Sequence, residues 1–188
     1  YFSDPSSVTF TNYKIKVNVT KVDTKEVTYN STYGTLGATP TRYGYTFAGW
    51  YTAESGGTKV ETTTKVATAS DHTLYAHWKD SAKPTCTFSG PSPSSIKVDA
   101  TATYILKCTD TAGAEFNDYD ISSDDFTQST SGVLTISAPT RTAITNGYQY
   151  TITVTGAKVG STTLTLKAGV IADKSNNTNN AATSSSIT

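Results

Sequence analysis

Apolar and polar residues alternate over short stretches of this chain, and this alternation predicts half-buried β-strands. In the first half it is clearest at residues 13–20 (YKIKVNVT) and at residues 72–78 (HTLYAHW). The former places Tyr13, Ile15, Val17 and Val19 on one face. Between them we expect a turn at 21–25, strands at 26–30 and 45–52, and a loop at 31–44 that holds three glycines and Pro40.

The second half carries a longer series of short apolar stretches separated by turn residues, which is typical of a β-sandwich. Residues 147–156 (GYQYTITVTG) alternate most regularly, and residues 100–110 (ATATYILKCTD) direct Ala102, Tyr104, Leu106 and Cys108 to one face. The other strands that we expect lie at 85–89, 114–121, 132–138, 161–171 and 183–188. Since no amphipathic helix of three turns is evident, the sequence predicts a mostly β fold.

Composition narrows the class of protein. The chain has 188 residues, with 15 basic and 15 acidic side chains and a formal net charge of +0. This balance predicts no nucleic-acid partner. No apolar run approaches the roughly 20 residues needed to span a bilayer, so we expect no membrane insertion in this segment. Because the first residue is Tyr1, we expect a piece of a longer protein.

The stretch GYTFAGWYTAESGG at residues 44–57 concentrates aromatic side chains. Such a cluster is either the core of a very small domain or a platform for a ligand. We favour the core for Phe47, Trp50 and Trp78, because a small domain needs large buried side chains. Phe47 and Trp50 would face opposite ways on a regular strand, so we predict a bulge at Gly49. Tyr45 and Tyr51 are expected to be partly exposed.

The first half resembles the Listeria–Bacteroides repeat, the B-repeat module of internalin-type surface proteins. The resemblance rests on PTRYGYTFAGWYT, on the glycine pair that follows six residues after Trp50, and on TLYAHW. It covers residues 8–79 and implies a small β-grasp-like module on the outside of a bacterial cell.

The second half resembles bacterial Ig-like domains of surface proteins. The resemblance rests on YTITVTG, on TLTLKAGVIADK and on the Asn-rich loop that follows. We therefore predict a B-repeat module at 8–79, a linker at 80–84 and an Ig-like β-sandwich at 85–188.

The two cysteines, Cys86 and Cys108, fall on apolar faces of neighbouring predicted strands. We predict that they form a disulfide across strands or between sheets, which is compatible with an oxidising compartment. A pair of buried free thiols is the alternative. Closing a loop of this length stabilises the fold by about 3 kcal/mol.

The sequence offers little chemistry, and we predict no enzyme activity, no cofactor and no metal site. His72 and His77 are five residues apart, so a regular strand sends them to opposite faces. We expect a solvated loop at the four aspartates Asp118, Asp120, Asp124 and Asp125. The loop DKSNNTNN holds the lone carboxylate Asp173 with the amides of Asn176, Asn177 and Asn179, and a lone carboxylate makes a weak calcium site.

These patterns favour a structural role, as a monomeric spacer that carries a functional head away from the cell wall. We expect an extracellular location, at the bacterial cell surface or secreted, with neighbouring domains of the parent protein as partners. Two alternatives remain. The modules could be an adhesin that binds a host protein or glycan, because interfaces favour Tyr and the chain holds 12. They could also be accessory domains of a secreted enzyme that acts on polysaccharides.

Overall fold

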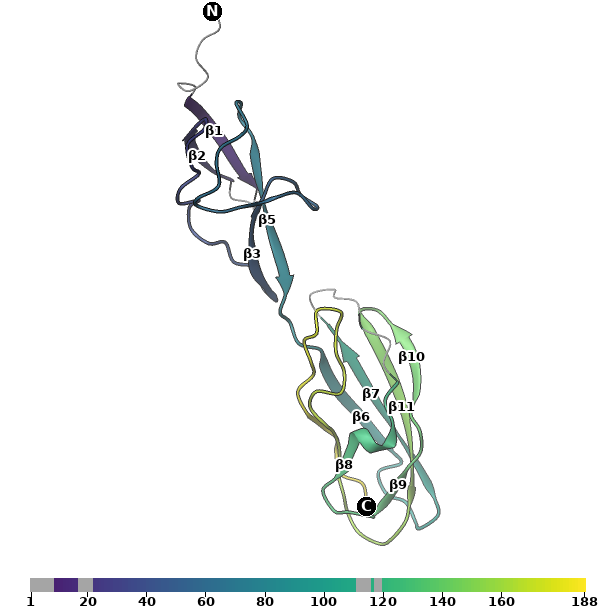
Figure 1. Cartoon of the computed structure of the whole chain (residues 1–188). Coiled ribbons are helices and arrows are strands. Elements are labelled where there is room, and N and C mark those ends of the chain that lie inside the picture. The colour runs from purple at the N-terminus through teal and green to yellow at the C-terminus, as the bar shows by residue number, and fades with distance from the viewer. Residues whose placement is uncertain (1–8, 17–21, 111–115, 117–119) are drawn as a thin grey trace, which may run out of the picture. The chain divides into compact units, whose positions relative to one another are not determined.

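The computed structural model describes residues 9–16, 22–110, 116 and 120–188. The fold is mostly β, as the sequence predicts, and it divides into two compact units, Tyr1–Lys79 and Asp80–Thr188 (Figure 1). In the described part of the chain, no helix has the length and apolar character needed to cross a lipid bilayer.

The first unit is built on one five-stranded sheet with the order β2-β1-β5-β3-β4. At its centre β1 and β5 run parallel, while the flanking pairs β1–β2 and β3–β4 are antiparallel. This arrangement is β-grasp-like. The strands are β1 (Thr9–Lys16), β2 (Val22–Thr28), β3 (Tyr45–Tyr51), β4 (Lys59–Val60) and β5 (Thr73–Asp80).

The core of the first unit is small and combines aliphatic side chains with a few large rings. Trp50 is 6% exposed, and the partly buried Phe47 packs against it edge-on with the ring centres 5.2 Å apart. The two rings therefore lie on the same side, as predicted. Gly49 between them has φ 137°, which changes the alternation of the strand. Trp78 is only half-buried, although its ring contacts Phe47. The other buried members are Val27, Tyr33, Leu36, Val60, Val66 and Leu74.

Several boundaries in the first unit differ from the sequence prediction. The turn expected at 21–25 is wrong from Val22 onward, because β2 already begins there. β1 covers the first part of the strand predicted at 13–20, whereas residues 17–20 lie outside the described residues. The two-residue strand β4 was not predicted, since it is too short to show alternation.

The second unit is a sandwich of two sheets. One has the order β10-β11-β7-β6, with β9 also paired to β11, and the other has the order β13-β12-β8. Since β9 and β10 pair with successive parts of β11, they form one interrupted strand. The orders then correspond to the ABED and CFG sheets of an immunoglobulin-type sandwich. The strands are β6 (Thr85–Ser92), β7 (Thr101–Thr109), β8 (Phe126–Gln128), β9 (Leu134–Ile136), β10 (Thr140–Ile144), β11 (Gly147–Gly156), β12 (Leu164–Leu166) and β13 (Ala182–Thr183).

The alternation of apolar and polar residues in the sequence predicts which side chains form the core of this sandwich. On β7 the inward residues Ala102, Tyr104, Leu106 and Cys108 are all buried, as predicted. On β11, Tyr150, Ile152 and Val154 are buried, and on β12 Leu164 and Leu166 are buried. The prediction is correct here because each strand has one face against the core and one toward solvent.

Other elements of the second unit were missed or misplaced. β8, β10 and the short 3-10 helix η2 (Ser123–Asp125) were not predicted. The strand predicted at 85–89 ends too early, because β6 continues to Ser92 with an irregular register. The strand predicted at 114–121 falls mostly outside the described residues, although Phe116 forms a bridge with Asp173.

Candidate functional site: a buried carboxylate cluster

Three aspartates of the second unit meet at one end of the sandwich. Asp80 is the last residue of β5 and also the first residue of the second unit, five positions before β6 begins. Asp110 directly follows β7, and Thr109 before it pairs with Thr85. Asp173 lies in the loop between β12 and β13. Because β6 starts where the antiparallel strand β7 ends, the sheet itself brings Asp80 and Asp110 close together.

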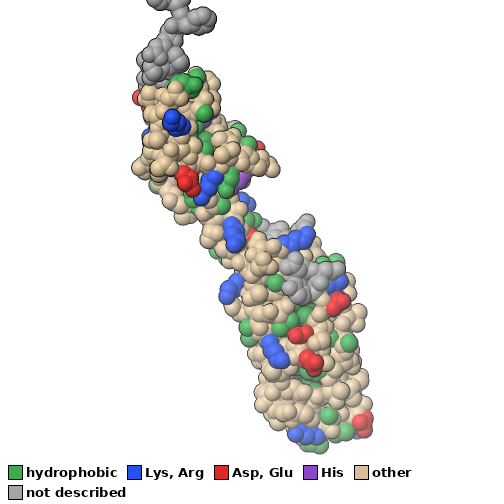
Figure 2. All heavy atoms as spheres, in the orientation of Figure 1, with side chains coloured by type: hydrophobic (Ala, Val, Ile, Leu, Met, Phe, Trp, Pro, Cys, Tyr) green, Lys and Arg blue, Asp and Glu red, His purple; other side chains and the backbone are tan. Residues whose placement is uncertain are grey.

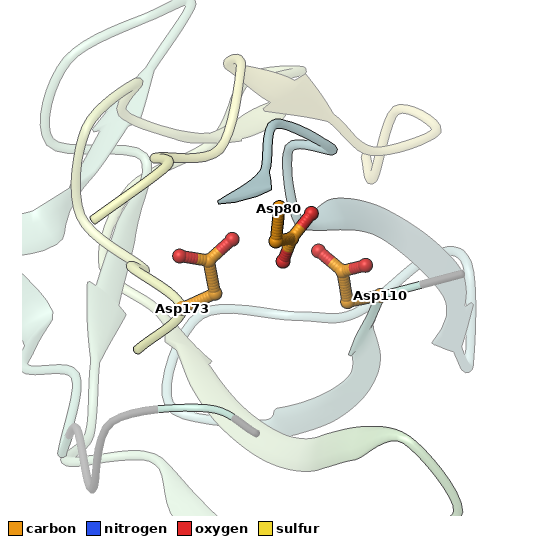
Figure 3. Close-up of side chains that lie close together, drawn as sticks. All are labelled: Asp80, Asp110 and Asp173. Atoms are coloured by element: carbon orange, nitrogen blue, oxygen red, sulfur yellow. The ribbon is translucent and has the colours of Figure 1, made fainter. Parts of the chain in front are cut away.

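The three carboxyl groups are directed toward a common centre (Figure 3). One oxygen atom of each lies within 4.8 Å of the other two. All three residues are buried, with exposed fractions of 9% for Asp80, 1% for Asp110 and 0% for Asp173. Asp is almost never fully buried unless it is paired or binds a metal, so this arrangement calls for an explanation.

The loop after β12 holds Asp173 in a fixed orientation. Its Oδ1 accepts hydrogen bonds from the backbone N–H groups of Ser175 (2.8 Å) and Asn177 (2.9 Å). Its Oδ2 accepts a third from the side-chain amide of Asn177 at 2.8 Å. Together these bonds fix the direction in which the carboxylate points.

Asp80 is held from both sides but keeps one oxygen without a hydrogen bond. Its Oδ1 accepts the backbone N–H of Ala82 at 2.9 Å, and the amide of Asn177 donates to its backbone carbonyl at 3.3 Å. Its Oδ2 is buried and has no hydrogen-bond partner among the described residues. An unsatisfied buried acceptor costs about 1–3 kcal/mol, more if it is charged.

The sequence identified Asp173 and treated it as a lone carboxylate. That reading was incomplete, because Asp80 and Asp110 come from distant parts of the chain. The amide of Asn179 in the same loop serves the backbone. Asn179 accepts the N–H of Ile171 and donates to the carbonyls of Lys167 and Asn180, and Asn176 adopts φ 66°.

In the other acidic segment, two of the described aspartates contact residues close to them in the fold. Asp120 lies 3.4 Å from a guanidinium nitrogen of Arg141. Asp125 accepts hydrogen bonds from the backbone and the hydroxyl of Ser122, which caps η2. Asp124 is exposed. Asp118 lies outside the described residues.

The two histidines lie in separate environments of the first unit. His72 Nε2 is 2.6 Å from the hydroxyl of Tyr33. His77 stacks on the ring of Tyr51, with centres 3.8 Å apart, and its Nε2 is 2.9 Å from the carbonyl oxygen of Ala53. Tyr51 and Tyr45 are half-buried, as expected. Each histidine therefore packs with an aromatic ring of its own.

Cys86 and Cys108 form a disulfide in this structure. They are directly opposite each other on β6 and β7, with their Cα atoms 4.1 Å apart. The bridge therefore joins neighbouring strands of one sheet, rather than the two sheets. Cys108 is fully buried, and Cys86 packs against the same core.

The strand order and the small core of the first unit define a β-grasp-like module. Residues 7–77 match the model of the family described as the Listeria-Bacteroides repeat domain. A similar curated protein is Internalin H of Listeria monocytogenes serovar 1/2a, which is 44% identical over 64 residues. This alignment covers 34% of the chain and only 12% of Internalin H. The first unit is thus a repeat module of the Listeria–Bacteroides type.

Proposed function

We propose that this chain is a non-catalytic spacer segment of a bacterial cell-surface protein. The repeat module of its first unit and the similarity to Internalin H support a surface location. The second unit would be a bacterial Ig-like domain that extends the segment. In this role the chain holds a functional head at a distance and binds no host protein or glycan itself.

The observation that carries the proposal is the use of the aromatic stretch. Trp50 is buried in the core of the first unit, and the partly buried Phe47 packs against this core instead of lying fully open to a ligand. On the faces seen in Figure 2, Lys and Arg side chains are scattered among Asp, Glu and uncharged polar side chains. A surface of this kind keeps a module soluble and offers no large patch of one charge to a partner.

An exchange experiment tests the spacer role. The segment would be placed between a wall anchor and a reporter head on a bacterial surface, and antibody access to the head would be measured. We expect access to fall when the segment is deleted. It should recover when an unrelated folded segment of equal length replaces it. Failure of the unrelated segment to restore access would contradict a purely passive role.

Adhesion is the second candidate, and one feature of the second unit favours it. A hollow of about 330 Å³ is lined in part by Ile96, Val98, Val133 and Val159. Val98 is 45% exposed and Val159 is 94% exposed. An aliphatic hollow suits an apolar side chain of a protein better than a glycan.

A binding screen separates the two candidates. The fragment at micromolar concentration would be tested against host-cell surface proteins and against glycans. The spacer proposal expects no binder. A binder that is lost with Val159→Ser and kept with Tyr43→Ser, a change at a residue 90% exposed on the other unit, would establish adhesion through the hollow.

A further inference from the structure

We propose that Asp80, Asp110 and Asp173 form a binding site for one calcium ion. The three carboxylates converge from three separate segments of the second unit, and one oxygen of each falls within a space 4.8 Å across. A calcium ion at this centre gives the buried Oδ2 of Asp80 a partner that no residue in the described part of the chain supplies.

Charge is the first argument. Three carboxylates at this distance repel one another, and burial weakens the screening that water would provide. A divalent cation removes most of this repulsion and uses the carboxylates as ligands. The backbone N–H groups of Ser175 and Asn177 already orient Asp173 as an acceptor, which prepares it for a cation.

The donor set selects the kind of cation. The group consists of carboxylates alone, and hard cations prefer oxygen ligands, whereas zinc and copper favour nitrogen or sulfur. Magnesium requires a tight octahedron with short bonds and usually retains several waters. Calcium accepts six to eight oxygens in a flexible geometry, which suits three carboxylates on loops.

The spacing agrees with this choice. Calcium–oxygen bonds are about 2.3–2.6 Å long, so two oxygens on one ion are separated by at most about 5 Å. The 4.8 Å limit within the cluster lies inside this range. Side chains that bind in one-oxygen or two-oxygen mode can provide three to six ligands, and water completes the shell.

The position of the site indicates what the ion does. It joins the segment that begins the second unit to the end of β7 and to the loop after β12. The disulfide links only β6 and β7, so it crosslinks neither the segment of Asp80 nor the loop of Asp173. The ion therefore stabilises the end of the sandwich that the disulfide does not reach.

Thermal unfolding of the full chain tests this site at neutral pH. The wild-type protein would be scanned in EDTA, in 10 mM calcium chloride and in 10 mM magnesium chloride, at equal ionic strength. Extracellular calcium sites have Kd values of about 10⁻⁴–10⁻³ M, so 10 mM calcium lowers the unfolding equilibrium constant of the second unit at least tenfold. The midpoint of that unit should rise by about 5 °C or more.

The variant Asp80→Asn keeps the shape of the side chain and removes its charge. We expect it to abolish the calcium response and to raise the midpoint in EDTA, because repulsion within the cluster falls. The matched controls are Asp71→Asn and Asp124→Asn, two exposed positions, and both should respond like the wild type.

Three results would overturn the proposal. The first is a wild-type midpoint that calcium leaves within 1 °C of its value in EDTA; this measurement needs no variant to fold. The second is a normal calcium response in Asp80→Asn. The third is an equal rise in magnesium, which would refute the assignment to calcium.

Discussion

The two units are both built from β-strands, but they reach stability by different means. The first has a small core in which two large rings, Trp50 and Tyr33, join five aliphatic side chains, and Phe47 packs against Trp50. The second has a core with more than twice as many buried members, and it adds a disulfide. It also buries three carboxylates, whereas the buried side chains described in the first unit are apolar.

Size explains this difference. A module of about 70 residues buries a small fraction of its surface, so each core side chain must contribute a large apolar area. A sandwich of about 110 residues buries a larger fraction of its surface. The free energy from its apolar core can therefore offset the cost of burying charge at one end. The first unit is therefore sensitive to single core changes, and the second to its crosslink and its polar cluster.

Trp50→Ala should have the largest effect and should separate the units. Loss of a buried Trp costs about 3–5 kcal/mol, which is comparable with the whole stability of so small a module. We expect calorimetry to lose the transition of the first unit and to keep that of the second. Tyr43→Ala, at a position 90% exposed, serves as the control and should shift neither transition. Simultaneous loss of both transitions would show that the units do not fold independently.

Reduction of the disulfide should act on the second unit alone. The cysteines are 22 positions apart, and closing a loop of this length is worth about 3 kcal/mol. We expect a reductant to lower the second transition and to leave the first in place. The double variant with Cys86→Ala and Cys108→Ala should no longer respond to the reductant. Titration of two free thiols in the unfolded, unreduced protein would refute the bridge itself.

Gly49→Ala probes the backbone of the first unit. Gly49 has φ 137°, which an L side chain rarely adopts, so we expect a loss of about 1–3 kcal/mol. A new Cβ would also lie 2.7 Å from Cε of Lys59. Adding Lys59→Ala separates the two causes. Recovery of stability in the double variant would assign the loss to the contact instead of the backbone.

Alkaline pH should produce the smallest effect. Burial raises the pKa of Tyr104 above its ordinary 10. Above pH 10 the unfolded chain loses this proton first, so stability falls as pH rises, by at most about 1.4 kcal/mol per pH unit for one group. Tyr104→Phe should make this decline shallower in the second transition. An unchanged slope would place the alkaline loss elsewhere.

Alternation predicted the strands that have one buried and one solvated face, such as β7 and β11. It failed where a strand is too short to alternate, as in β4 and β8, and where the chain bends without leaving the sheet, as at Gly90. Trp78 was assigned to the core, but it lies near the end of β5 and stays half-buried. Its position in the pattern could not reveal how much protein covers it.

The carboxylate cluster could not be predicted from the sequence, for a different reason. Asp80 stands in what reads as a polar linker, and Asp110 stands at the end of an apolar strand. Only the pairing of β6 with β7 and the course of the loop after β12 bring them to Asp173. A faint signal was present, since Asp173 is followed by Asn and Ser residues that orient a carboxylate. No residue near Asp173 in the sequence indicated that Asp80 and Asp110 lie beside it.

The covalent link between Cys86 and Cys108 also matters if the chain is pulled from its ends. Tension that arrives at Cys86 passes through the sulfur atoms to Cys108 and skips the residues between them. Those positions, 22 along the chain from one cysteine to the other, correspond to about 75 Å of extended polypeptide that cannot be drawn out. The bridge thus caps how far the second unit lengthens under load, whatever happens to its hydrogen bonds.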